Sequence, residues 1–179
     1  LYVGELSISK GVTRIVEALA CCKEASMDVK CTLLGEWRND NVRLNVQKYI
    51  ADKSLSSYLD FPGLIKGDEK WHYFANAHVL VHPTDLDGQP LAILEAIGSG
   101  LAVISTHVGA IPDTVESGRN GFLMNEISTD ELFRCICLFY ENRDVLDKIR
   151  HHNLSVFESK YSLDAYLKNN DQWLFHEIR

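Results

Sequence analysis

The chain has 179 residues, of which 46% are hydrophobic and 24% charged, ordinary values for one globular domain with a substantial core. Its formal net charge is −7 and it has no dense run of lysine and arginine, which argues against nucleic acid as a partner. The longest apolar runs, such as residues 101–104, are too short to span a bilayer.

The cysteine pattern predicts a cytoplasmic protein. The five cysteines, at positions 21, 22, 31, 135 and 137, form no C-x-x-C pair and are odd in number. They are best interpreted as reduced thiols packed as small apolar residues. No basic segment followed by an apolar run opens the chain, so we expect no signal peptide. Since the chain starts at Leu1 and directly on a strand pattern, we also expect it to be part of a longer protein.

Strand and helix patterns alternate along the whole chain. Strands are expected at 1–4, 29–34, 58–61, 79–82, 101–105 and 122–124. Helices are expected at about 12–25, 41–53, from a cap at Asp68, 90–97, 111–116, from a cap at Ser128 or Thr129 to 140, 143–157, and from a cap at Ser162 onward. This order predicts an α/β fold with a Rossmann-like parallel sheet of about six strands, covered by helices on both faces, in a single domain over residues 1–179.

Ligands of such sheets bind where the strands end, at their carboxyl edge. The segments that follow the predicted strands are 4–11, 35–37, 63–68, 83–89 and 106–112, and glycines and small polar residues concentrate there. His82 and His107 also fall at strand ends. We therefore expect a binding site on this edge.

The stretch from residue 83 to 105 carries most of the chemical signal. Asp87 precedes the expected helix and Glu95 lies inside it, and a carboxylate can accept hydrogen bonds from two hydroxyl groups of a sugar or ribose. Gly88 and the helix start at residues 89–91 would let a phosphate approach helical N–H groups. The alternative is a plain loop-to-helix junction, with Asp87 an ordinary loop acid and Glu95 a solvated helix residue.

Lys10 follows the first strand, where it can reach a diphosphate as a point charge. A surface lysine at a turn is the alternative interpretation. The first strand is followed by neither a G-x-G-x-x-G nor a Walker A motif, which disfavours a dinucleotide cofactor and P-loop chemistry. No His/Cys cluster has metal spacing, so we expect no structural metal.

Five motifs in order resemble those of one family over nearly the whole chain. They are YVGELSISKGV, the Leu-Leu-Gly turn at 33–35, FPGLIKGDEKWHYFANAHVLVHPT, DGQPLAILEAIGSGLAVIST and VGAIPDTVESGRNGFL. Together they resemble the C-terminal, donor-binding domain of the retaining glycosyltransferases of the GT-B fold, family-4 type (glycosyl transferases group 1). The fourth motif corresponds to the Glu-x7-Glu signature of that family.

The resemblance implies specific roles for these residues. Lys10 would contact the diphosphate, Asp87 would hold hydroxyl groups of the donor sugar, and Glu95 would bind the ribose, which makes the two acids the expected catalytic pair. The backbone of Gly88, Gln89, Pro90 and Leu91 would lie against sugar and phosphate, and Leu64 and Ile65 would lie against the base.

Some positions depart from the family pattern. Glu5 stands where many members have an arginine five positions before the lysine, which removes a phosphate cation unless Arg14 or Lys66 replaces it. Asp87 stands where a glutamate is usual. Ala110 and Asp113 replace a glycine and a glutamate of the later motif.

The implied function is transfer of a sugar from a UDP- or GDP-sugar to a glycan or lipid-linked acceptor. Transfer would proceed with retention, without metal or cofactor, in the synthesis of a polysaccharide, O-antigen, capsule or glycolipid. An N-terminal acceptor domain would be absent, leaving this fragment inactive alone, and membrane association would run through that domain. A hydrophobic patch at Trp173 and Leu174 would be its trace. The alternatives are a catalytically degenerate nucleotide-sugar-binding module and a GT-B epimerase.

Overall fold

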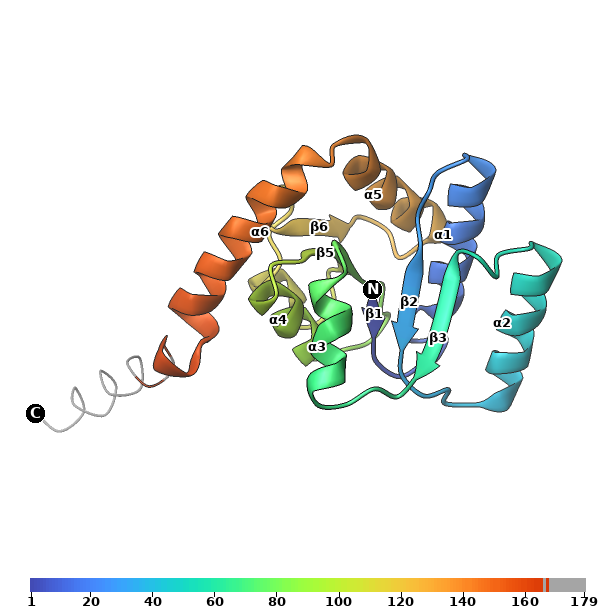
Figure 1. Ribbon diagram of the computed structural model, residues 1–179, viewed down its shortest axis with the longest axis horizontal. Helices are drawn as coiled ribbons and strands as arrows, with labels where there is room; N and C mark the ends of the chain where they lie inside the picture. Colours follow the sequence, from blue (N-terminus) through green and yellow to red (C-terminus); the bar gives the residue numbers. More distant parts are fainter. Residues whose placement is uncertain (166, 168–179) are drawn as a thin grey trace, which may run out of the picture.

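The computed structural model describes residues 1–165 and 167. Strands alternate with helices in chain order (Figure 1). The elements are β1 (Tyr2–Val3), α1 (Val12–Glu24), β2 (Cys31–Leu34), α2 (Asp40–Asp52), β3 (Leu59–Gly63), α3 (Asp68–Ala75), β4 (Val79–His82), α4 (Leu91–Gly98), β5 (Ala102–Thr106), the 3₁₀ turn η1 (Ile111–Asp113), β6 (Gly121–Met124), α5 (Thr129–Glu141), α6 (Asp144–Val156) and the π-helical turn η2 (Phe157–Tyr161).

The strands form one parallel arrangement. Strands β1, β2 and β3 pair in that order, as do β4, β5 and β6, and every pairing is parallel. Leu1 joins the two groups, because its amino terminus donates to the Val79 carbonyl at 2.9 Å and its carbonyl accepts from Val81 N–H at 2.8 Å. The order is therefore β3-β2-β1-β4-β5-β6, that of a doubly wound sheet whose strand order reverses between β1 and β4. The predicted fold class is confirmed.

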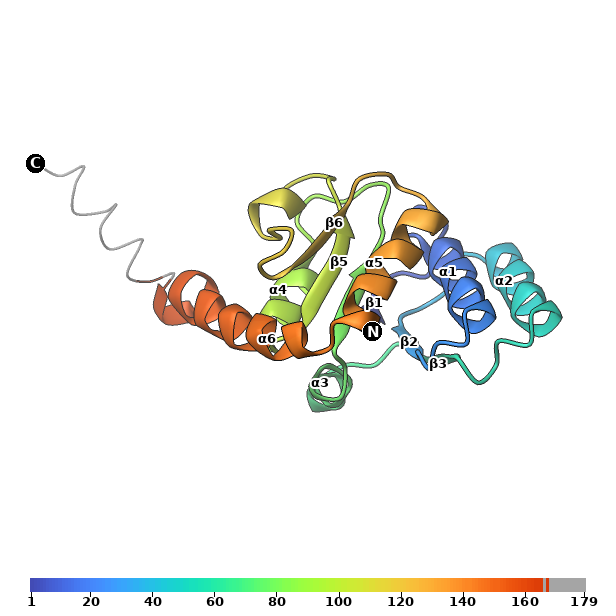
Figure 2. The ribbon, with the colours of Figure 1, turned by 90° about the horizontal axis from the view of Figure 1, so that it is seen from above.

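Helices cover both faces of the sheet because successive strand side chains point to opposite sides. On one face, Val81 and Ile104 pack in a cluster with buried residues of α1, α2 and α5. On the other face, Leu80 and Val103 pack with buried residues of α3 and α4. Figures 1 and 2 show α1 and α2 side by side at one end of the molecule, with α4 and α6 toward the other. The continuous apolar runs of β4 and β5 follow from this two-sided burial.

Several local predictions need correction. The α3 helix is preceded by Gly67 as its N-cap, so Asp68 is the first helical residue and not the cap. The helix expected over 111–116 is only the three-residue turn η1. Ser128 caps α5 by accepting from Glu131 N–H at 3.2 Å, which decides between the two candidates. The patch expected at Trp173 and Leu174 lies outside the described residues.

None of the helices in the described part of the chain combines the length and apolarity that a membrane span requires.

The glycine turn after β1 brings two distant loops together. Gly11 has φ of 84°, and a Cβ there would lie 2.2 Å from the carbonyl oxygen of Pro83. Only a glycine permits this approach. The segment after β1 thus lies directly against the segment after β4.

Candidate functional site

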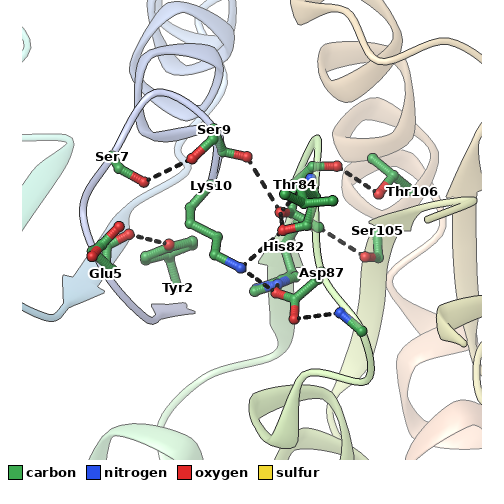
Figure 3. A network of polar contacts seen from close by, with 12 residues as sticks. Tyr2, Glu5, Ser7, Ser9, Lys10, His82, Thr84, Asp87, Ser105 and Thr106 are labelled. Carbon is green, nitrogen blue, oxygen red and sulfur yellow. Dashed lines mark hydrogen bonds and ion pairs between the residues drawn. The ribbon is translucent and has the colours of Figure 1, made fainter. Parts of the chain in front are cut away.

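Lys10 and Asp87 meet at the point where the strand order reverses. Lys10 lies between β1 and α1, and its Nζ is 2.7 Å from Asp87 Oδ2 and 2.9 Å from the Leu86 carbonyl. Asp87 lies between β4 and α4, and its Oδ1 accepts from Gly88 N–H at 3.0 Å. The Nε2 of His82, the last residue of β4, is 3.1 Å from the same Oδ2 (Figure 3). The Asp87 carboxylate is therefore held by a lysine, a histidine and the backbone together.

Buried hydroxyl groups hold the loop after β4 in this position. Thr84 donates from Oγ1 toward the Ser9 carbonyl at 3.3 Å and the Leu86 carbonyl at 3.0 Å. Its own carbonyl accepts from Thr106 Oγ1 at 2.8 Å, and Ser105 Oγ donates to the His82 carbonyl at 2.8 Å (Figure 3). Small polar residues at the ends of β4 and β5 thus satisfy the backbone of a sharply turning loop.

Glu95 has a partner that the sequence analysis missed. Lys70 on α3 places its Nζ 2.6 Å from Oε1 and 2.7 Å from Oε2 of Glu95 on α4. The side chains are 21% and 24% exposed. A carboxylate on this largely apolar helix needs a partner, and Lys70 is that partner. A lysine in the first turn of the preceding helix was the only sequence signal that pointed to its identity.

Asp87 and Glu95 therefore belong to separate ion pairs. Lys10 holds the first acid and Lys70 the second. Within the described part of the chain, no side chain pairs with both acids. The positive charge of one lysine offsets the negative charge of each carboxylate. The site is therefore more nearly neutral than the acid-rich sequence indicates.

The loop after β5 closes over the loop that carries Asp87. Gly109 has φ of 57°, and a Cβ there would lie 2.3 Å from the carbonyl oxygens of Asp87 and Gly88. Ala110 N–H donates to the Gly88 carbonyl at 2.8 Å. Pro90 is the N-cap of α4, and no described side chain caps this helix. The backbone of Gly88 is thus fixed while the start of α4 keeps its partial positive charge.

Glu5, which departs from the expected sequence motif, faces away from Asp87. Its carboxylate pairs with Arg38 Nη1 at 3.0 and 3.2 Å, and its carbonyl accepts from the Tyr2 hydroxyl at 2.7 Å. Arg14, one of the two cations considered as a replacement, donates to the Pro83 carbonyl and pairs with Asp85 at 2.7 Å. Both the acid and the arginine are therefore committed to partners outside the Lys10–Asp87 pair.

Burial and pairing shift the pKa values of the central groups. Desolvation lowers the pKa of His82 below its ordinary value, and the hydrogen bond to Asp87 only partly opposes this. Burial raises the pKa of Asp87, but the hydrogen bonds from Lys10 and His82 outweigh burial and leave it below its ordinary value. At neutral pH the site thus holds an ionised aspartate beside an uncharged histidine.

A sequence model of the family described as "Glycosyl transferases group 1" matches residues 1–142. The chain belongs to this family. Similar curated proteins include the D-inositol 3-phosphate glycosyltransferase of Pseudarthrobacter chlorophenolicus, 28% identical over 127 residues, which are 70% of this chain and 30% of that protein. The alpha-monoglucosyldiacylglycerol synthase of Acholeplasma laidlawii is 22% identical over 169 residues, 94% of this chain and 41% of that protein. The chain thus spans well under half the length of these relatives.

Solved structures of other proteins share the fold. HepE from Anabaena, solved in complex with UDP, aligns with a TM-score of 0.84 at 21% identity, covering 98% of this chain and 48% of that one. The C-terminal domain of the group 1 protein LpcC from Francisella tularensis aligns with a TM-score of 0.81 at 20% identity, covering 90% of this chain and 85% of that one. The fold of this glycosyl transferases group 1 chain is therefore that of one half of a GT-B enzyme.

The other residues predicted for the site lie around the same edge. Leu64 is 49% exposed after β3, whereas Ile65 packs on the cluster of α3 and α4. Leu91 is 72% exposed at the start of α4, and the Gln89 side chain lies 3.5 Å from Thr114 Oγ1. Their assignments to base, sugar and phosphate stay predictions.

A cavity of about 950 Å³ lies elsewhere. It opens where the strands begin, next to Leu1, Cys31 and Val79, and neither Lys10 nor Asp87 lines it. We place the candidate site at the carboxyl edge, because charged and polar groups converge there while the cavity is mainly apolar. Within residues 1–165 and 167, no three His, Cys, Asp or Glu side chains are grouped as metal ligands.

Proposed function

We propose that this chain is the donor-binding domain of a glycosyltransferase that uses a UDP- or GDP-sugar and retains the anomeric configuration. The observation that carries the proposal is the Lys10–Asp87 pair at the switch point of the sheet, beside the uncapped start of α4. A cation for the diphosphate and an acceptor for sugar hydroxyl groups stand together there. HepE, which has the same fold, has been solved with UDP-glucose, which supports a nucleotide sugar as the ligand class.

Each side chain would have a distinct task in the reaction. Transfer leaves negative charge on the departing diphosphate, and Lys10 together with the N-terminus of α4 would stabilise that charge. Because Lys10 is 27% exposed on a flexible stem, it can exchange Asp87 for a phosphate oxygen. Asp87 would accept hydroxyl groups of the sugar, and Glu95, held by Lys70, those of the ribose. These charges would serve in place of a metal ion or cofactor.

The acceptor would be bound by a second domain. Since the chain covers 48% of HepE and 41% of the Acholeplasma synthase, we infer that the complete enzyme has an N-terminal half that binds a glycan or lipid-linked acceptor. That half would also mediate any association with a membrane. The present domain would bind the donor in the cytoplasm, where its thiols stay reduced, and would not transfer sugar alone.

Calorimetric titration with UDP, GDP, ADP and their sugars tests donor binding. We expect one nucleotide family to bind, and Glu95→Ala to abolish its binding while the circular dichroism spectrum stays native. Glu141→Ala, at the exposed end of α5, is the matched control and should bind as wild type. Unchanged affinity in Glu95→Ala would contradict the ribose assignment, and no binding to any nucleotide would contradict the donor-domain proposal.

Retention needs the complete protein. Proton NMR of the first product should show the same anomeric coupling as the donor sugar, and inversion would refute a retaining mechanism. The degenerate-module alternative draws on Glu5 and Asp87, which stand where an arginine and a glutamate are usual in the family. A full-length protein that binds the donor but turns over no sugar with any acceptor would favour that alternative.

A further inference from the structure

We propose that His82 is a positioning residue for donor-sugar recognition, because it fixes the Asp87 carboxylate when Lys10 turns to the diphosphate. The inference rests on the proposed function and assigns a task to a histidine that the donor-binding assignments leave unused. His82 does not touch the ligand in this scheme and acts only through Asp87.

The imidazole of His82 is held firmly in place. The residue is 3% exposed, and its ring stacks on Tyr2 of β1 with centroids 6.0 Å apart and planes 10° from parallel. Its backbone carbonyl accepts from Ser105 Oγ at 2.8 Å, and its Nε2 lies 3.1 Å from Asp87 Oδ2 (Figure 3). The ring is therefore buried, and among the described residues its one hydrogen-bond partner is the acid.

The hydrogen-bonding inventory fixes which nitrogen carries the proton. An ionised carboxylate only accepts, so Nε2 must be the donor to Asp87. Among the described residues, the buried Nδ1 of His82 has no hydrogen-bond partner. Burial lowers the pKa of His82, which favours the neutral ring, and the neutral Nε2–H tautomer leaves only an acceptor unpaired at Nδ1. His82 Nε2–H is therefore the donor and Asp87 Oδ2 the acceptor of this hydrogen bond.

Lys10 and His82 share one carboxylate oxygen but differ in freedom. Lys10 Nζ and His82 Nε2 both approach Oδ2, whereas Gly88 N–H approaches Oδ1. The side chain of Lys10 is 27% exposed, so a diphosphate can draw it away; His82 cannot leave. After that exchange, His82 remains the side-chain donor that keeps Asp87 oriented and ionised. Sugar binding would then depend on His82, and binding of the nucleotide alone would not.

The test compares a nucleotide sugar with its nucleoside diphosphate, using the best-binding pair from the titration panel. In His82→Leu we expect affinity for the sugar form to fall about tenfold, the loss of one hydrogen bond to a charged group. Affinity for the diphosphate should stay within about twofold of wild type, because Lys10 and α4 are unchanged. His82→Gln can place an amide N–H where Nε2 stands and should recover most of the loss. His78→Leu, exposed just before β4, is the matched control and should behave as wild type.

Each outcome decides the inference. Equal losses for both ligands in His82→Leu would indicate a structural role and overturn it, as would no loss, or a His82→Gln variant no better than His82→Leu. If His82→Leu does not fold, His82→Gln and ¹⁵N NMR of the wild-type imidazole decide: Nε2–H at neutral pH is expected, and Nδ1–H would overturn it. Wild type that binds no nucleotide or sugar would instead refute the proposed function, and the NMR result would still decide the contact.

Discussion

The Lys70–Glu95 pair allows a quantitative prediction, because it joins two helices through a partly buried contact. The perturbations are Lys70→Met, Glu95→Gln and the double variant. Both carboxylate oxygens lie within 2.7 Å of Nζ, and α3 and α4 approach each other across 25 positions of sequence. Each single variant leaves the other partner without its hydrogen bonds, and the double variant removes both.

The expected coupling follows from the geometry. Two unit charges 2.7 Å apart, the longer of the two N–O distances, attract by about 6 kcal/mol at an effective dielectric constant of 20, before desolvation and side-chain ordering are subtracted. Exposed pairs keep at most about 1 kcal/mol, and hydrogen bonds to charged groups keep about 1.5–3 kcal/mol. With side chains 21% and 24% exposed, this pair lies between those classes. We expect a coupling of about 1–2 kcal/mol in the free energy of unfolding.

Urea unfolding of the wild type and the three variants measures this coupling. In thermal unfolding, each single variant should also lower the melting temperature by roughly 2–6 °C, and the double variant by less than the sum. Arg119 and Glu116 form the control pair, with a similar distance of 2.8 Å but side chains 67% and 52% exposed, and should show no measurable coupling. A Lys70–Glu95 coupling no larger than that of the control would refute the argument.

Three further outcomes are expected. Gly109→Ala should lower the free energy of unfolding by about 1–3 kcal/mol, since its Cβ would meet two carbonyl oxygens at 2.3 Å. Gly118→Ala, with φ of 82° but no described atom within 4 Å, should lower it less, and equal losses in urea unfolding would contradict this. Because the pKa of His82 is lowered in the folded state, the histidine contributes stability above pH 6.5 that is lost as pH falls. The melting temperature should therefore drop more from pH 7 to 5 in the wild type than in His82→Gln, and an equal drop in both would contradict this linkage. Burial raises the pKa of Cys22 to about 12 and of Cys135 to about 11. Mass spectrometry should therefore find both thiols alkylated at pH 8 only after unfolding, and rapid alkylation of the folded chain would show that the thiols are accessible to the reagent.

The sequence predicted the parts of the site that depend on strand order. Lys10 and Asp87 follow β1 and β4, and the ends of these strands meet wherever a doubly wound sheet reverses its order. Lys70 was missed because its contact with Glu95 depends on how α3 packs beside α4, which periodicity does not specify. The assignment of Asp68 as the helix cap failed for a local reason. Gly67 takes a positive φ of 63° at that position, so the acid falls inside the first turn.

His82 shows a second limit on what could be predicted from the sequence. Its place at a strand end was read correctly, but whether a histidine there faces solvent or an acid depends on the side chains above and below it. Here Tyr2 lies beneath the ring, and Asp87 comes back over it from the loop. The acid follows the histidine by five positions, and only the turn between them makes the hydrogen bond.

Three ion pairs link segments that precede β4 in the chain with segments that follow it, and the cation lies on the earlier segment in each. Lys10, Arg14 and Lys70 precede β4, whereas Asp87, Asp85 and Glu95 follow it. An approaching diphosphate therefore meets a surface whose charges are already balanced, on a protein with a net charge of −7. Such a surface gives little long-range attraction. Donor capture should be governed by short-range exchange of partners, and the association rate should change little with ionic strength while the dissociation rate sets the affinity.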